Sequence, residues 1–417
     1  MIRRIKIEGY KSLSNVELEL DSLTVIFGPN SAGKSNLFDA LGLLSRMVTS
    51  KTLRDAFDPR MHRGTPIEAF TYGPQGLEGL LSSEEAKFTM EVDVELSPHV
   101  IETVETRIRQ LREGLPHRQE EKPRRRVTER FLRYRITVEI VPKTGVLRVM
   151  DEYLAALTSE GTENRQRKPF IEQENQRLKL RMEGQARPTE HEVGLDYTLV
   201  SSSLYPPHYP HITAFREELS RWRFYYLEPD RMRAETAIQE VSALDRHGAD
   251  LAPFYYTMKQ QDNKKFQGIQ KALTLLVPGV SGLDVRPTPS GLLELEIQVN
   301  GVRYSSRLIS EGTLRVLGLL AITRPLAPIS VVGYEEPENG VHPRRLQLIA
   351  ELFAQAVHDT GTQFLVNTHS PVLPDYMKTE AKLIACYQTS QGTQFEYVEP
   401  LFVENLTQRI LQGDFGG

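Results

Sequence analysis

Cysteine is almost absent from this 417-residue sequence, in which Cys386 is the single example. One thiol excludes an internal disulfide and a zinc site built from paired cysteines, as is usual for a cytoplasmic protein. We expect Cys386 to be a small core residue. The sequence also lacks an apolar run long enough to span a bilayer, and its first ten residues, MIRRIKIEGY, alternate like a strand rather than a signal peptide. Neither secretion nor membrane insertion is expected.

An excess of positive charge is missing as well. The formal net charge is −4, so any contact with nucleic acid must come from a local patch. Internal repeats are not visible either. With 39% hydrophobic and 25% charged residues, a chain of this length can bury a large core and should form more than one lobe.

A phosphate-binding loop is present near the N-terminus. An apolar strand at residues 23–27 precedes GPNSAGKS, residues 28–35, and helical apolar spacing follows. This is the G-x-x-x-x-G-K-[ST] pattern, in which backbone N–H groups and the helix N-terminus bind phosphates, Lys34 meets the outer ones and Ser35 binds Mg²⁺. The loop predicts ATP and Mg²⁺ as cofactors. The expected contact residues are Asn30, Ser31, Ala32, Gly33, Lys34, Ser35 and Asn36.

Two adjacent glutamates, Glu335 and Glu336, follow a short β-branched apolar run at residues 329–332. Such a run is typical of a central strand in a parallel sheet, where ligands gather at the strand ends. Adjacent carboxylates repel each other unless a cation or a proton-handling task separates their roles. Either the pair forms an exposed acidic turn, or Glu335 binds the Mg²⁺ that Ser35 also touches while Glu336 polarises the attacking water. The phosphate loop favours the second interpretation.

Apolar periodicity predicts three parts of the chain. Residues 1–96 form an N-terminal lobe with the phosphate loop, and residues 221–417 form a C-terminal lobe. Residues 97–220 are rich in charge, proline and glycine, and we interpret them as an inserted α+β subdomain. The predicted strands lie at residues 2–7, 16–20, 87–96 and, as a pair, within 132–150. The predicted helices lie near residues 101–112, 213–222, 260–276 and 311–323.

Two further features are expected in the C-terminal lobe. Asn300 and Gly301 supply the positive φ angles that a tight hairpin turn needs. A last strand, in TQFLVNTHSP, ends in Thr368, His369 and Ser370. Because the phosphate loop and these strands lie at opposite ends of the chain, both ends must meet in one sheet.

Four segments occur in a fixed order: the phosphate loop, SEGT at 310–313, EEPENGVHP at 335–343 and NTHSP at 367–371. With the phrases EGYKSL and LDRHGADLAPFYY, they resemble the ABC-class ATPase heads of RecF, SMC and OLD proteins. The likeness is greatest to the stand-alone OLD-like group without a nuclease domain. It covers residues 1–96 and 221–400, whereas residues 97–220 match no family pattern. The resemblance implies an α/β fold, an ABC-type P-loop NTPase head built from N- and C-terminal lobes.

The resemblance also implies roles for single residues. Glu336 would be the catalytic glutamate, and His369 would sense the γ-phosphate, although a lone histidine can also be structural. Glu335 stands where most ABC heads carry aspartate, but a longer carboxylate can still reach Mg²⁺ through water. Glu338 and Asn339 would lie in the loop that meets a partner subunit.

The SEGT segment resembles the family's signature motif. In that reading Ser310 and Gly312 contact the γ-phosphate held by the opposite subunit of a head-to-tail homodimer. A simple helix cap by Ser310, with a glutamate in the first turn, fits the same residues locally. Lys11 corresponds to a basic residue that approaches the phosphates in related heads, or it is a surface lysine in a turn. Gln75 is the candidate for the family's glutamine loop.

Three functions compete on this evidence. The first is an ATP-switched dimeric head that acts on or senses DNA in repair or anti-phage defence, with residues 122–135, KPRRRVTERFLRYR, as the basic candidate surface. A solvated helix face leading into a strand is the alternative for that stretch. The second is a regulatory scaffold that controls a separate nuclease or toxin, because OLD nucleases continue into a nuclease domain and this chain ends soon after His369. The third is the motor of a membrane transporter. Such a motor is expected to carry an LSGGQ-type signature, so SEGT at 310–313 and the large insertion argue against this function.

Overall fold

The computed structural model describes residues 1–58, 62–73, 75–113 and 126–399, and the chain folds into two compact units. The first unit comprises residues 1–21, 31–222 and 387–395. The second comprises residues 22–30, 223–386 and, among the described residues, 396–399. The predicted division at residues 1–96, 97–220 and 221–417 stays a prediction.

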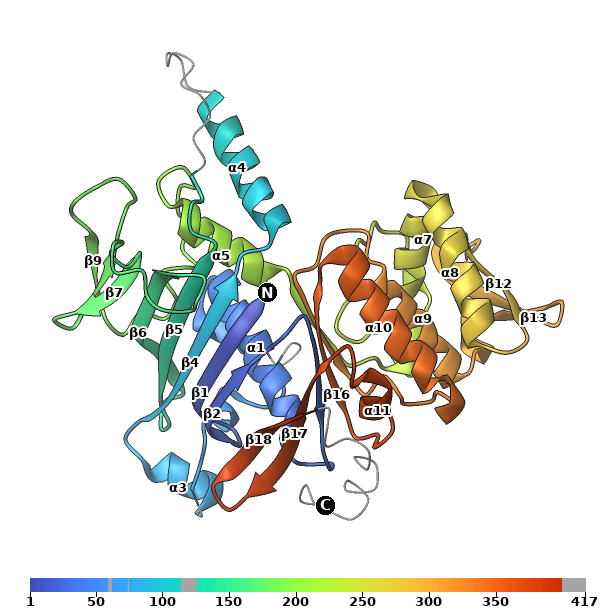
Figure 1. The fold of residues 1–417 in the computed structure, drawn as a ribbon, viewed down its shortest axis with the longest axis horizontal. Coiled ribbons are helices and arrows are strands. Elements are labelled where there is room, and N and C mark those ends of the chain that lie inside the picture. Colours follow the sequence, from blue (N-terminus) through green and yellow to red (C-terminus); the bar gives the residue numbers. More distant parts are fainter. Residues whose placement is uncertain (59–61, 74, 114–125, 400–417) are drawn as a thin grey trace. The chain divides into compact units, whose positions relative to one another are not determined.

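An antiparallel sheet forms the centre of the first unit, in the order β2-β1-β4-β5-β6-β7-β8-β9 (Figure 1). In β5 the side chains of Leu132, Tyr134, Ile136 and Val138 are buried, so its period-2 pattern turns one face to the core. The strands are β1 (Ile2–Tyr10), β2 (Leu13–Glu19), β4 (Ala86–Glu95), β5 (Phe131–Val141), β6 (Val146–Leu157), β7 (Ile171–Glu174), β8 (Arg177–Leu180) and β9 (Thr189–Glu192).

Helices complete the first unit. The helix after the phosphate loop, α1, is buried along most of its length and packs against α5, which also packs against α4. The described part of residues 97–220 therefore shares one compact unit with the N-terminal strands. The helices are α1 (Lys34–Thr49), α2 (Leu53–Ala56), η1 (Pro66–Ala69), α3 (Gly76–Ser82), α4 (Pro98–Glu113) and α5 (Pro210–Ser220).

Another sheet has the order β10-β15-β16-β3-β17-β18, and its strands β15, β16 and β3 lie in the second unit. Its central strands β15, β16, β3 and β17 are parallel, so their carboxyl ends share one edge. All five residues of β3 and of β15 are buried, as the continuous apolar runs predict. The strands are β3 (Leu23–Phe27), β10 (Trp222–Tyr225), β15 (Val331–Glu335), β16 (Gln363–Thr368), β17 (Lys382–Thr389) and β18 (Gly392–Val398).

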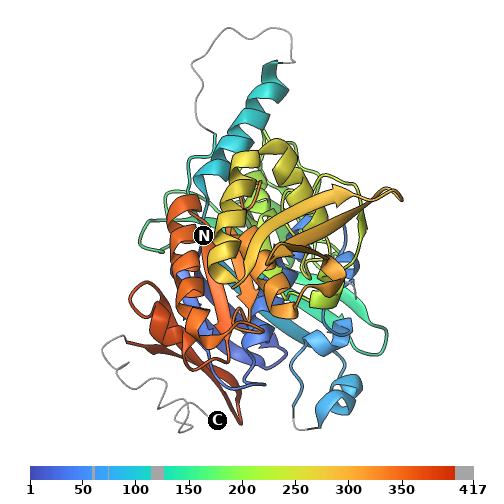
Figure 2. The same ribbon diagram turned by 90° about the vertical axis from the view of Figure 1, so that its right-hand side faces the viewer.

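A smaller antiparallel sheet belongs to the second unit, and its twisted ribbon of β12 and β13 packs against α7 and α8 (Figure 2). Its strands are β11 (Thr236–Ala237), β12 (Val280–Pro287), β13 (Leu292–Val299) and β14 (Val302–Ser305). The helices of this unit are α6 (Pro229–Met232), α7 (Leu251–Gln261), α8 (Asn263–Leu276), η2 (Ser306–Leu308), α9 (Glu311–Thr323), η3 (Pro343–Arg345), α10 (Leu346–Thr360) and α11 (Leu373–Met377).

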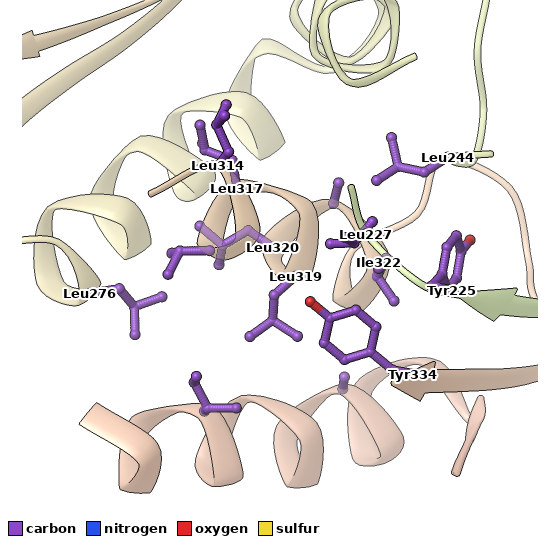
Figure 3. Packing of buried hydrophobic residues seen from close by; sticks show 14 of the residues in the cluster. Tyr225, Leu227, Leu244, Leu276, Leu314, Leu317, Leu319, Leu320, Ile322 and Tyr334 are labelled. Atoms are coloured by element: carbon purple, nitrogen blue, oxygen red, sulfur yellow. The ribbon is translucent and has the colours of Figure 1, made fainter. Parts of the chain in front are cut away.

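Helix α9 lies in the middle of the second unit's core. Its apolar residues surround the helix instead of forming one stripe, and ten of its thirteen residues are buried. Figure 3 shows Leu314, Leu317 and Leu320 of α9 beside Leu276 of α8, while Tyr334 of β15 reaches toward the same helix. The core therefore fixes α9 to β15, the strand that ends at Glu335.

Most predicted elements are confirmed, with one correction. The hairpin of β13 and β14 turns at Asn300 and Gly301, whose φ angles are 49° and 82°. The helix predicted at residues 260–276 is α8, but it begins later, at Asn263, because a separate helix, α7, which the sequence did not predict, ends at Gln261. The Asp262 carboxylate accepts the Lys265 N–H at 2.9 Å and so caps α8. Among the described residues, no helix is both long and apolar enough to cross a membrane.

Candidate nucleotide site

The phosphate loop leaves the second unit's sheet from the carboxyl end of β3. Phe27, the last residue of β3, pairs with Thr368 of β16 and with Ala385 of β17. A Cβ atom on the next residue, Gly28, would overlap the backbone carbonyl oxygen of Cys386. Only glycine fits such a close approach, which explains the first glycine of the motif. Cys386 itself is buried, as its predicted core role requires.

The rest of the phosphate loop belongs to the first unit. Gly33 is the N-cap of α1, with φ 103°, and offers no side chain to the first helical N–H groups. Such an N-terminus suits an anion. Lys34, the first residue of α1, is buried. Ser31 has a φ of 66°, a left-handed conformation that keeps the loop tightly turned.

Two residues that the sequence analysis did not single out hold this part of the loop. The Thr393 hydroxyl donates to the Ala32 carbonyl oxygen at 2.9 Å and lies 2.6 Å from the Ser12 hydroxyl. The Asn36 side-chain amide donates to Ser12 at 2.8 Å. Ser12 stands in the phrase EGYKSL, which drew attention to Lys11 instead. Thr393 lies so far along the chain that no local pattern marks it.

The two glutamates stand at the carboxyl end of β15. Glu335 is buried and lies in register with Asn367 of β16. Glu336 has a φ of 53°, and its N–H donates to the Asn367 carbonyl oxygen at 2.9 Å, so the chain turns sharply there. The side-chain amide of Asn339 donates to Glu336 Oε2 at 2.5 Å. The pair is therefore held in a structured loop, and the interpretation as a simple exposed acidic turn is wrong.

His369 follows β16 and faces the same loop. Its Nδ1 lies 3.4 Å from Glu336 Oε1 and 3.4 Å from Glu338 Oε1. Its side chain is 39% exposed, so it is not a buried structural histidine. The parallel strands β15 and β16 thus bring His369 close to Glu336 and Glu338, which lie more than thirty residues earlier in the sequence.

Two buried polar atoms at this edge of the sheet lack a hydrogen-bond partner among the described residues. They are the side-chain nitrogen of Asn367 and Oε2 of Glu338. Buried polar groups are usually paired, so unpaired ones at strand ends fit a site that binds a polar ligand. The buried carboxylate oxygens of Glu335 at the same edge fit Mg²⁺, a hard cation that prefers oxygen ligands.

The predicted signature motif begins α9. Ser310 is its N-cap, and the Ser310 hydroxyl accepts the Thr313 N–H at 3.3 Å. The helix-cap interpretation is therefore confirmed, while a contact between Ser310 and a phosphate stays a prediction. A Cβ atom on Gly312 would overlap the Gly340 carbonyl oxygen. Gly312 thus lets the start of α9 pack against the loop that carries Glu336.

Lys11 is tied to α1. Its ammonium contacts the carboxylate of Asp39 and donates to the Arg63 carbonyl oxygen at 3.0 Å, and its side chain is only 14% exposed. Lys11 lies in a turn, with a φ of 46°, and its contact with a phosphate stays a prediction. Burial raises the pKa of the Asp39 carboxyl, but the charges of Lys11 and His62, with hydrogen bonds from Lys11 and Tyr10, outweigh it and lower that pKa below its usual value.

The remaining candidates are not brought into these clusters. Gln75 is exposed at the start of α3, and its glutamine-loop role stays a prediction.

In the basic stretch, residues 122–135, the first four residues, 122–125, lie outside the described residues. Arg133 donates to both carboxylate oxygens of Asp93 at 2.7 Å, and Arg135 donates to Asp151 at 2.9 Å. These two arginines are engaged within the sheet, which weakens this stretch as a DNA-binding surface.

Comparison with known proteins identifies the family and the fold. A family model described as "AAA domain, putative AbiEii toxin, Type IV TA system" matches residues 23–375. None of the curated proteins compared with the chain matches it. A crystal structure of the SmcHead bound to the C-winged helix domain of ScpA aligns with a TM-score of 0.52 at 13% identity, over 95% of this chain and 98% of that one.

Two other solved structures are similar at lower scores. The SMC head domain from Thermotoga maritima has a TM-score of 0.41 at 13% identity, over 95% of this chain and 99% of that one. An Smc head domain with an extended coiled coil, bound to the C-terminal domain of ScpA derived from Pyrococcus furiosus, has a TM-score of 0.49 at 12% identity, over 98% and 99%. The chain belongs to the AAA_21 family and has the fold of an ABC-class P-loop ATPase head of the RecF and SMC type.

Proposed function

We propose that this protein binds ATP with Mg²⁺ and hydrolyses it. One observation carries the proposal: β3, β15 and β16 are parallel neighbours, so the start of the phosphate loop, the two glutamates and His369 share one edge of a sheet. Ligands of α/β proteins bind at the carboxyl ends of such strands. The 3.4 Å separation of His369 Nδ1 and Glu336 Oε1 supports a joint role for these two side chains.

Each residue then has a distinct task. Backbone N–H groups of the phosphate loop and Lys34 bind the phosphates, and Ser35 and Glu335 hold the metal ion. When bound, Mg²⁺ neutralises charge on the phosphate oxygens. Glu336 orients the attacking water and accepts its proton, and His369 contacts the γ-phosphate. Phosphoryl transfer depends mainly on such positioning and electrostatic stabilisation.

Two substitutions test this assignment. Lys34→Ala should abolish ATP binding, because it removes the cation that faces the outer phosphates. Glu336→Gln should keep ATP binding and lower the rate of hydrolysis by a factor of about a hundred or more, as expected for loss of a general base. Binding of a fluorescent ATP analogue and release of phosphate measure the two effects. Equal turnover by Glu336→Gln and wild type would remove Glu336 from the mechanism.

We further propose that two copies pair head to tail, with Ser310 and Gly312 of one copy facing the phosphates held by Lys34 of the other. Two observations support this. Ser310 stands at the positive N-terminus of a thirteen-residue helix, and Gly312 leaves that end without a bulky side chain. Each ATP site would then be completed by a second chain.

The biological role that we propose is a nucleotide-controlled switch in DNA repair or anti-phage defence. The family description names a toxin and a toxin–antitoxin system, which favours defence and supports a scaffold that controls a separate effector. DNA binding is the competing role. Replacing Arg124, Arg125 and Arg126 by glutamate should weaken binding to every DNA sequence and flatten its salt dependence if this stretch contacts phosphates. A protein that ignores DNA at low salt, with or without ATP, would favour the scaffold.

A further inference from the structure

Glu338 is a carboxylate that is buried although it lies in a loop. It lies in the glutamate loop, residues 336–342, which connects β15 with η3. Its side chain is only 9% exposed. A carboxylate in a surface loop normally remains in water, since burial of its charge is costly unless hydrogen bonds compensate. The neighbours of Glu338 therefore show what keeps it buried.

Three donors converge on a single oxygen of Glu338. Oε1 accepts the hydroxyl of Thr368 at 2.6 Å and the backbone N–H groups of His369 and Ser370, both at 3.1 Å. These donors come from the end of β16 and from the histidine loop, residues 369–372, which leads to α11. Hydrogen bonds to a charged acceptor are about twice as strong as neutral ones. Glu338 thus clamps the backbone on both sides of the His369 side chain.

The histidine loop has other ties of its own. The Ser370 N–H also donates to the Thr368 hydroxyl at 2.9 Å, and the Ser370 hydroxyl accepts the N–H groups of Val372 and Leu373 at 3.2 and 3.3 Å. These bonds stay within the loop and the start of α11. The hydrogen bonds to Glu338, in contrast, join this loop to the glutamate loop. They hold the imidazole beside Glu336, 3.4 Å from its carboxylate.

We propose that Glu338 is a positioning residue for ATP hydrolysis, which holds His369 at the distance from Glu336 that the reaction needs. The proposal rests on the proposed ATPase function. Glu338 acts through the histidine loop and does not touch the nucleotide. A shift of about 1 Å in a reacting group can lower a rate by about a hundredfold, so loss of this clamp should reduce turnover more than binding.

The unpaired Oε2 of Glu338 offers a rival explanation, in which this carboxylate binds the metal ion directly. The two explanations differ in what glutamine can replace. A glutamine side chain keeps one carbonyl oxygen, which can accept the same three hydrogen bonds, but it loses the charge and the second oxygen. Glu338→Gln should therefore preserve the clamp, whereas it should fail as a metal ligand.

The experiment compares Glu338→Ala with Glu338→Gln in the full-length protein, with kcat, KM for ATP, ATP affinity and thermal stability measured for each. We expect Glu338→Ala to lower kcat by about ten- to a hundredfold with little change in ATP affinity, and Glu338→Gln to retain kcat within about threefold of wild type. A glutamine variant as slow as the alanine variant, or an alanine variant as fast as wild type, overturns the proposal.

A double-mutant cycle with His369→Ala tests whether Glu338 acts through His369. If it does, Glu338→Ala should have little further effect on kcat once His369 is gone, because the two changes remove one function. Independent, multiplicative losses contradict the proposal. Thr368→Val removes one of the three donors at nearly constant volume, and it should give a smaller loss of kcat even if Glu338→Ala does not fold. If Thr368→Val has the same kcat as wild type, the proposed role of Glu338 as a clamp is contradicted.

Failure of the proposed function would be visible separately. If wild-type protein releases no phosphate from ATP, the ATPase assignment fails before any variant is compared. If wild type hydrolyses ATP and Glu336→Gln does not, the assignment holds. The Glu338 variants then test the positioning role alone.

Discussion

At the scale of single residues, Asp39 shows how α1 is anchored within the first unit. Its carboxylate accepts hydrogen bonds from the Lys11 ammonium and, at 2.7 Å, from the Tyr10 hydroxyl. The side chains of Asp39 and Lys11 are both largely shielded from water. Removing one partner of a buried ion pair leaves the other charge uncompensated. Asp39 therefore contributes to the stability of the helix that follows the phosphate loop.

Asp39→Ala should lower the free energy of unfolding of the first unit by about 3–5 kcal/mol, as found when one partner of a buried ion pair is removed. The matched control is Glu8→Ala, which removes the exposed partner of Lys6 and should cost at most about 1 kcal/mol. Urea unfolding followed by circular dichroism measures both. If both substitutions lower the unfolding free energy by the same small amount, the contact between Lys11 and Asp39 stabilises the protein no more than an exposed ion pair does.

Glu152 links the stability of the first unit to pH. It accepts the N–H groups of Leu199 and Val200 at 2.6 and 3.1 Å and the Tyr134 hydroxyl at 3.0 Å. Burial raises the pKa of this carboxyl to about 7, although those hydrogen bonds oppose the change. Because the folded chain binds this proton more tightly than the unfolded chain, the stabilisation is complete below pH 4.5 and is lost as the pH rises through 7.

Glu152→Gln should remove this pH dependence. Between about pH 5 and about pH 8, wild type should lose up to about 3 kcal/mol more of unfolding free energy than the variant, since each pKa unit corresponds to about 1.4 kcal/mol. Urea titrations of both proteins at the two pH values give the difference. Parallel pH profiles for wild type and Glu152→Gln would show that Glu152 stays ionised in the folded protein.

The sequence could not predict which residues of the site contact each other when they lie far apart along the chain. Lys34, Ser35, Glu335 and Glu336 stand in short motifs whose chemistry is readable from spacing alone. Contacts such as Thr393 with Ala32 join segments more than three hundred residues apart, and no local pattern encodes them. The same holds for the clamp that Glu338 makes on the histidine loop. These contacts depend on strand order in the sheet.

At the scale of elements, strands were easier to predict than helix boundaries. The apolar runs of β3 and β15 and the Asn300-Gly301 turn gave strong local signals. Helices α7 and α8 follow each other with one residue between them, so their apolar patterns merge in the sequence. The break comes from the Asp262 cap, which is a side-chain contact and not a change in periodicity.

Helix α9 should be the most sensitive element to loss of apolar volume. Leu317 is completely buried in the core that joins α9 to the neighbouring helices and β15, so Leu317→Ala should cost about 2–5 kcal/mol of unfolding free energy. The matched control is Leu275→Ala on α8, where the side chain is 75% exposed and the cost should be below about 1 kcal/mol. Urea unfolding measures both. Similar costs would contradict the central place of α9 in the core.

At the scale of the whole molecule, the proposed function requires a second chain to complete each ATP site. The family match and the SMC-head fold concern the single chain. Pairing with a second copy follows from the proposed role of Ser310 and Gly312. A two-fold, head-to-tail pair has two equivalent sites, so binding of ATP should couple directly to assembly.

The mass of Glu336→Gln in solution tests this central claim most directly, because this variant should bind ATP and hydrolyse it too slowly to separate again. We expect light scattering to show twice the monomer mass with Mg²⁺ and ATP, and the monomer mass without nucleotide. Adding Lys34→Ala, which removes ATP binding, or Ser310→Arg, which blocks the proposed interface with a bulky cation, should each prevent the doubling. A mass that stays at the monomer value while ATP is bound would contradict the account.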